Sequence, residues 1–132
     1  NLCVRSHVND LLREIVCDTR DVTYFFLDGR DMGSVVFMDA DLKIFLTASL
    51  DVRAERRFKQ RSSGESFEEV KNKLAKRDKE DRSRQVGALV EPEGCWLLVS
   101  SDLSLEETVR KILDRLKQER DPISPRFSDA DQ

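Results

Sequence analysis

The stretch FLDGRDMGSVVF, residues Phe26–Phe37, joins two apolar runs through a charged turn. The first run, Val22–Leu27, is β-branched, aromatic and apolar throughout, which is typical of a strand covered on both faces. Arg30 and Asp31 follow it closely. Charged residues at the end of a strand form either a solvent-exposed turn or the edge of a binding site. Ligands of open α/β sheets bind outside the carboxyl ends of the strands, so the placement favours a binding site.

Outward from this stretch, helical and extended patterns alternate along the chain. The apolar spacing predicts four helices: Val4–Ile15, Asp51–Arg61, Ser66 to about Arg84, and Ser104 to at least Leu116. The last two begin with the capping boxes SFEE and SLEE. Besides Val22–Leu27, strands are expected over Leu42–Leu46 and Trp96–Val99, and Val35–Phe37 is expected to be a short extended piece or the start of a connector. Strands that alternate with helices predict an α/β domain with a parallel sheet.

The composition excludes several classes of protein. The 132 residues suffice for one domain, and 23 basic against 26 acidic side chains leave a net charge of −3. Such a balance does not favour bulk attraction to nucleic acid or to an anionic membrane, so neither is expected as a partner. No apolar run has the length of a membrane span. Cys3, Cys17 and Cys95 have no metal-ligand spacing, which indicates reduced thiols in a cytoplasmic protein.

Both ends of the chain carry an expectation. The only methionines are Met32 and Met38, so Asn1 is not expected to be the site where translation starts, and the chain is interpreted as part of a longer protein. The tail of residues 120–132 contains Pro122 and Pro125 and has no apolar periodicity. It is predicted to be disordered.

The long helix from Ser66 carries a second charged group. Its apolar stripe has spacings of three and four residues: Phe67, Val70 and Leu74. The same stripe continues, in phase, as Arg77, Asp81 and Arg84. Guanidinium groups match phosphate oxygens and a carboxylate accepts from sugar hydroxyls, so this row could hold a phosphate and a sugar together. A solvated ladder of i, i+4 pairs is the other interpretation, which the periodicity alone favours, and both stay open here.

These motifs together resemble the bacterial cytidylate kinases (CMP kinases). The segments DGRDMGSVVF and DADLKIFLTAS carry the strongest resemblance, and VRSHVNDLLRE, RAERRFKQR, SFEEV, KRDKEDRSR and SLEETVRKIL occur in the family's order. The resemblance runs from about Val4 to Leu116. It implies a P-loop nucleoside-monophosphate kinase fold, with a parallel sheet, flanking helices and a helical lid at about residues 51–85 of a partial domain over residues 1–119. It also implies transfer of the γ-phosphoryl group of ATP to CMP or dCMP, with Mg²⁺.

The resemblance further implies roles for individual residues. Arg5 and Asp31 match positions at the cytosine base, and Arg30 matches one that holds the CMP phosphate. Arg77 and Asp81 match positions at the ribose, and Arg84 matches a further phosphate ligand, so Arg84 and Arg77 are the expected catalytic residues. Arg57 is the candidate for contacting ATP phosphates. A carboxylate that accepts from the cytosine amine would discriminate against uracil, which presents no donor there.

One motif of the family is missing from the 132 residues. None of the five glycines belongs to a G-x-x-x-x-G-K-[ST] P-loop, which binds the ATP phosphates and Mg²⁺. The first strand that carries it and most of the CMP-binding insert are missing too, so we expect an exposed sheet edge or an unfilled position beside the sheet. We also expect little kinase activity from this chain alone, and a P-loop segment or another chain as partner. A non-catalytic nucleotide-binding module and another nucleoside-monophosphate kinase, such as one for UMP, remain alternatives.

Overall fold

The computed structural model describes residues 2–60 and 64–120. Along the chain its elements are α1 (Leu2–Asp18), the π-helix η1 (Met32–Val36), β1 (Ile44–Thr47), α2 (Leu50–Gln60), α3 (Phe67–Arg82), β2 (Trp96–Val99) and α4 (Leu105–Arg120). The expected α/β class is therefore confirmed for the described residues. The four predicted helices and two of the three predicted strands occur, with boundaries shifted by a few residues. Residues 121–132, in the tail predicted to be disordered, lie outside the described part.

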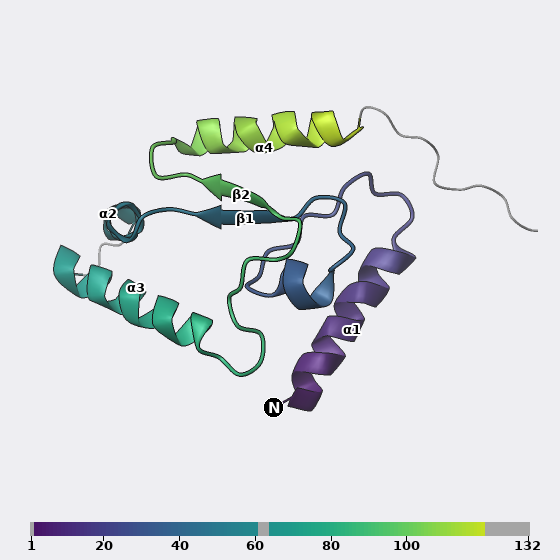
Figure 1. Cartoon of the computed structure of the whole chain (residues 1–132), viewed down its shortest axis with the longest axis horizontal. Coiled ribbons are helices and arrows are strands. Elements are labelled where there is room, and N and C mark those ends of the chain that lie inside the picture. Colours follow the sequence, from purple (N-terminus) through teal and green to yellow (C-terminus); the bar gives the residue numbers. More distant parts are fainter. Residues whose placement is uncertain (1, 61–63, 121–132) are drawn as a thin grey trace, which may run out of the picture.

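Two parallel strands form the sheet of the described region. β1 pairs with β2 in a register that sets Ile44 opposite Trp96 and Thr47 opposite Val99. Backbone hydrogen bonds of 2.8 Å continue the ladder at both ends, from Trp96 N to Lys43 O and from Ser100 N to Thr47 O. In Figure 1, α4 runs beside the strands on one side and α3 lies on the other. The predicted parallel pairing of these two segments is correct.

The helices α2 and α3 pack closely against each other. Phe58 and Phe67 stack edge to face, with ring centroids 6.2 Å apart. Arg53 donates two hydrogen bonds, of 3.0 and 2.7 Å, to the carboxylate of Asp78 and a third, of 2.9 Å, to the carbonyl of Ala48. Through these hydrogen bonds, Arg53 holds α3 against α2. The buried apolar residues come from η1, the start and middle of the α2 region, α3 and β2: Val36, Ala48, Ala54, Val70 and Leu98.

The prediction of a strand over Val22–Leu27 is wrong for this structure. These residues have no regular secondary structure, and their large side chains are exposed, Phe26 by 71%. A strand forms only when a neighbour accepts and donates its backbone hydrogen bonds. Within the described residues the sheet has two strands, and neither pairs with this segment. The expectation that the segment is covered on both faces is wrong for the same reason.

The extended piece expected at Val35–Phe37 is also wrong. Residues 32–36 form a π-helix, in which Val36 N donates to Asp31 O at 3.2 Å and Phe37 N donates to Met32 O at 2.7 Å. Single π turns are rare and occur often at functional sites. Asp31 stands at the amino end of this π-helix, and Val36, its last residue, is buried.

Candidate functional site

The base of the candidate site is the buried carboxylate of Asp31, which is 5% exposed. Asp31 stands at the N-cap of η1, and its side chain forms an ion pair with Arg5 of α1. The Arg5 side chain is only partly buried. Burying a carboxylate is expensive unless a cation pairs with it, so the contact with Arg5 balances the buried charge. Both residues match family positions at the cytosine base, and the structure brings them together.

A second buried carboxylate, Asp81, gathers three arginines. Asp81 is 3% exposed. Its Oδ2 lies 2.5 Å from Arg30 Nε and 3.9 Å from Arg77 Nε, and its Oδ1 lies 2.8 Å from Arg84 Nη2. Three guanidinium groups around one carboxylate leave an excess of positive charge. Their side chains remain partly exposed, so several of their N–H donors face solvent and could bind an anion.

Two local features position this cluster. The capping box of α3 joins Ser66 and Glu69 through hydrogen bonds in both directions, and fixes where the helix begins. These bonds from the Ser66 amide and hydroxyl hold the pKa of Glu69 below its ordinary value. From this start, the helical period carries Asp81 to the buried side, as the continued stripe predicted. The solvated ladder is therefore wrong for Asp81, although Arg77 and Arg84 do pair with it at i, i+4 and i, i+3 spacing.

A cleft of about 530 Å³ has two of the arginines paired with Asp81 in its wall, whereas its lining does not include Arg5, Asp31, Asp81 or Arg84. Arg30 and Arg77 line it together with Lys43. The remaining wall is largely apolar and comes from the segment around Phe25 and from β1. The cleft thus offers cationic groups beside an apolar surface, a combination that suits a ligand with one anionic end and one flat ring.

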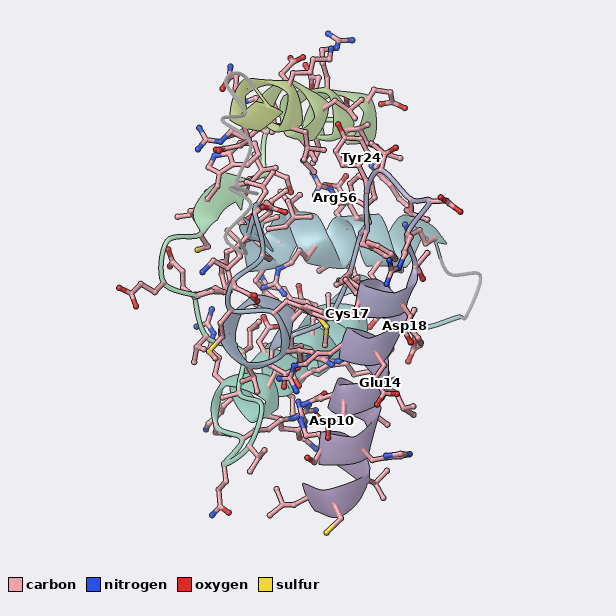
Figure 2. All side chains as sticks on the ribbon, turned by 90° about the vertical axis from the view of Figure 1, so that its right-hand side faces the viewer. Asp10, Glu14, Cys17, Asp18, Tyr24 and Arg56 are labelled. Carbon is pink, nitrogen blue, oxygen red and sulfur yellow. The ribbon has the colours of Figure 1, made fainter. Side chains whose placement is uncertain are left out.

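Arg57 does not join these groups. It is exposed on α2, and the arginines around Asp81 come from elsewhere. Its neighbour Arg56 has a structural contact instead, because it donates to Ser100 O at 2.5 Å and to Leu103 O at 2.9 Å. Figure 2 shows Arg56 between α2 and α4. Arg56 ties the start of α4 to α2.

Two residues at the site were not singled out from the sequence. Arg13, on α1 like Arg5, donates from Nε to Val36 O at 3.0 Å and from Nη2 to Val35 O at 3.1 Å. Gly87 lies against the Arg5–Asp31 pair. The spacing of Arg5 and Arg13, just over two helical turns, was a signal that both could face the same neighbour. Every residue has a backbone carbonyl, so the residue types at positions 35 and 36 do not indicate that Arg13 binds there.

No cation site or membrane helix was found in the described part of the chain. Residues 2–60 and 64–120 contain no group of three or more His, Cys, Asp or Glu side chains that could hold a metal ion. None of the helices in these residues is long and apolar enough to cross a membrane.

The fold and the site define the chain as an α/β protein with an arginine-rich pocket beside a parallel strand pair. The family model for cytidylate kinase matches residues 1–118. The chain belongs to the cytidylate kinase family, which has a P-loop nucleoside-monophosphate kinase fold.

Individual relatives agree with the family match. The chain is 38% identical over 116 residues to the cytidylate kinase of Cupriavidus pinatubonensis, covering 86% of this chain and 52% of that protein. It is 50% identical over 90 residues to the cytidylate kinase of Neisseria meningitidis serogroup C, covering 66% and 41%. With that of Thermotoga neapolitana the identity is 40% over 120 residues, covering 89% and 52%. The chain spans about half the length of these relatives.

Proposed function

We propose that this chain is the CMP-binding and lid-bearing part of a cytidylate kinase, which transfers the γ-phosphoryl group of ATP to CMP or dCMP. The family membership supports the reaction, and the relatives similar to this chain are named cytidylate kinases. The proposal includes a partial domain over residues 1–119 and a lid at about residues 51–85. For phosphoryl transfer the chain requires a P-loop, which these 132 residues do not contain.

The observation that carries the proposal is the contact between Arg30 and Asp81. Arg30 belongs to the GRD turn, whereas Asp81 belongs to α3, yet their side chains lie 2.5 Å apart. Two charged motifs that are distant in sequence thereby form one site. Without that convergence, each motif could be explained as a solvated surface.

The proposed roles of the side chains are those that the resemblance to the family implies, and the charges of these residues suit them. In the proposal, Asp31 accepts a hydrogen bond from the exocyclic amine of cytosine, and Arg5 donates to the acceptors of the same ring edge. Arg30 and Arg84 hold the phosphate, while Asp81 and Arg77 bind the ribose. Phosphoryl transfer needs mainly positioning and neutralisation of phosphates, so Arg84 and Arg77 are the proposed catalytic residues.

ATP and Mg²⁺ are assigned to a section that carries the P-loop. The described residues lack a cluster of carboxylates or imidazoles suited to a metal, and the sequence has no Walker lysine or adjacent hydroxyl. The donor set of this part therefore does not fit Mg²⁺, and no step is assigned to the metal here. Arg57, exposed on α2, remains the proposed contact to ATP phosphates.

A calorimetric titration of the 132-residue chain with CMP, and separately with UMP, tests the proposal. CMP is expected to bind at least about tenfold more tightly than UMP, because UMP leaves the buried Asp31 without a donor. Arg84→Gln should weaken CMP binding by about tenfold, the loss of one charged hydrogen bond. Arg82→Gln, at the exposed last residue of α3 and two positions before Arg84, serves as the matched control.

Two results would contradict the proposal. Tighter binding of UMP than of CMP would favour the alternative kinase. CMP binding with no gain of activity when a P-loop section is supplied would favour the non-catalytic module, the alternative that the missing P-loop keeps open.

A further inference from the structure

The turn after α3 brings a glycine against the base end of the site. α3 ends at Arg82, and Leu89 N returns to donate to Asp81 O at 2.8 Å. Between them, Gly87 adopts φ +66°, in the left-handed region that favours glycine. The loop thus leaves the Asp81 cluster and passes directly over the other buried carboxylate.

The contact at Gly87 is closer than any side chain allows. A Cβ atom there would overlap the guanidinium of Arg5 and would lie 2.7 Å from Asp31 Oδ2. The backbone of Gly87 therefore packs against the Arg5–Asp31 pair itself. Gly94 has nearly the same backbone conformation, φ +68°, but a Cβ at that position meets nothing within 4 Å. A turn alone accounts for Gly94, whereas Gly87 also requires space for Arg5.

We propose that Gly87 is a positioning residue for base recognition, because its backbone holds the Arg5 guanidinium in contact with Asp31. The inference rests on the proposed function, in which Arg5 and Asp31 contact the base. The end of the Arg5 side chain is movable and Asp31 is buried, so an added methyl group displaces Arg5 first. The phosphate end, at Arg30 and Arg84, does not contact this position and keeps its geometry.

Ligand binding to the Gly87→Ala variant tests this inference in the full 132-residue chain. The affinity for CMP is expected to fall about tenfold and the preference for CMP over UMP to shrink, since a base-reading group is displaced. Ribose 5-phosphate, which has no base, should bind as it does to the wild type. Gly94→Ala carries the same backbone strain and should leave all three affinities unchanged. Equal effects of the two variants on CMP would overturn the inference.

A second measurement needs no ligand and keeps the two proposals separable. In urea unfolding, Gly87→Ala should lower the folding equilibrium constant more than Gly94→Ala does, each by roughly fivefold or more because alanine is strained at positive φ. In an Arg5→Ala background the excess at Gly87 should become smaller, since only the close approach to Asp31 Oδ2 remains. An excess of unchanged size without Arg5 overturns the inference. Failure of the wild type to bind CMP, by contrast, counts against the proposed function alone.

Discussion

The charge of Asp81 is the feature on which the arginine cluster depends. Arg30, Arg77 and Arg84 share this single buried carboxylate. Without it, three like charges would face one another in a partly buried space. The same arrangement explains why a phosphate could replace or supplement the carboxylate: both offer oxygens to guanidinium donors.

Asp81→Asn is expected to lower the free energy of unfolding by about 2 kcal/mol, because the arginines lose their charged acceptor. Added inorganic phosphate should restore part of that loss, and should stabilise the variant more than the wild type. Urea unfolding with and without phosphate measures both effects. The exposed Asp39→Asn is the control, and equal stabilisation of wild type and Asp81→Asn by phosphate would contradict this account.

At the scale of elements, α1 depends on polar contacts. It has no buried residue, and most of its apolar side chains are exposed, with Val4, Val8, Leu11 and Ile15 among them. Figure 2 shows Asp10, Glu14 and Asp18 along the same helix. The contacts of Arg5 with Asp31 and of Arg13 with two carbonyls of η1 link this helix to the rest of the site.

Arg13→Ala is expected to loosen α1. Loss of its hydrogen bonds to Val35 O and Val36 O should cost about 1 kcal/mol, which lowers the amide protection of α1 roughly fivefold. Hydrogen exchange measured by mass spectrometry on peptides from α1 and α3 checks this. Protection in α3 should not change, and Arg20→Ala, an exposed residue just beyond α1, should affect neither helix. A uniform loss of protection would indicate general destabilisation instead.

The capping boxes of α3 and α4 predict a dependence on pH. Hydrogen bonds from Ser66 hold the pKa of Glu69 below its ordinary 4.5, and those from Ser104 do the same for Glu107. A lowered pKa in the folded state means that each carboxylate stabilises its helix start above pH 4.5, and that this contribution is lost as the pH falls through the lowered pKa.

The amide proton shift of Ser66 should report this loss, because Ser66 N donates to Glu69 Oε2 at 2.7 Å. In the wild type the shift should titrate below pH 4.5. In Glu69→Gln it should stay flat, since the amide oxygen still accepts but does not ionise. Titration of the Ser66 shift in both proteins would show that another group is responsible.

At the scale of the whole molecule, much apolar surface is left uncovered. Val22–Leu27 and the outward side chains of the strands, such as Leu46 and Leu97, are exposed. Apolar side chains of this segment and of β1 line the cleft, and burying them would stabilise the protein. Exposed apolar side chains on neighbouring segments suit an interface with further protein.

Co-expression with an amino-terminal section of a cytidylate kinase, chosen because it carries a P-loop, tests the proposed function of this chain. CMP-dependent ADP formation is expected only when both parts are present, and residues 22–27 should then gain amide protection as a strand acquires its neighbour. A partner whose P-loop lysine is replaced by alanine should confer the protection without the activity. Kinase activity of the 132-residue chain alone would refute this prediction.

Local patterns predicted the elements whose stability depends on neighbours within a few residues. The strand Trp96–Val99 and the capped start of α3 were located correctly, because a short apolar run and a capping box are both local patterns. The segment Val22–Leu27 has an equally strong local pattern and forms no strand in this structure. Its hydrogen bonds require a partner that its own residues do not supply.

The sequence by itself determined the family, the α/β class and the charged residue types at Arg30–Asp31 and Arg77–Arg84, because these follow from residue order and helical period. Only the tertiary structure decided that Arg30 meets Asp81, that Arg13 binds the carbonyls of η1, and that Gly87 packs on Arg5. Those contacts join residues far apart in the chain, and two of them involve backbone atoms, which every residue possesses. Their existence depends on where the packed elements lie, and no local pattern of side chains specifies it.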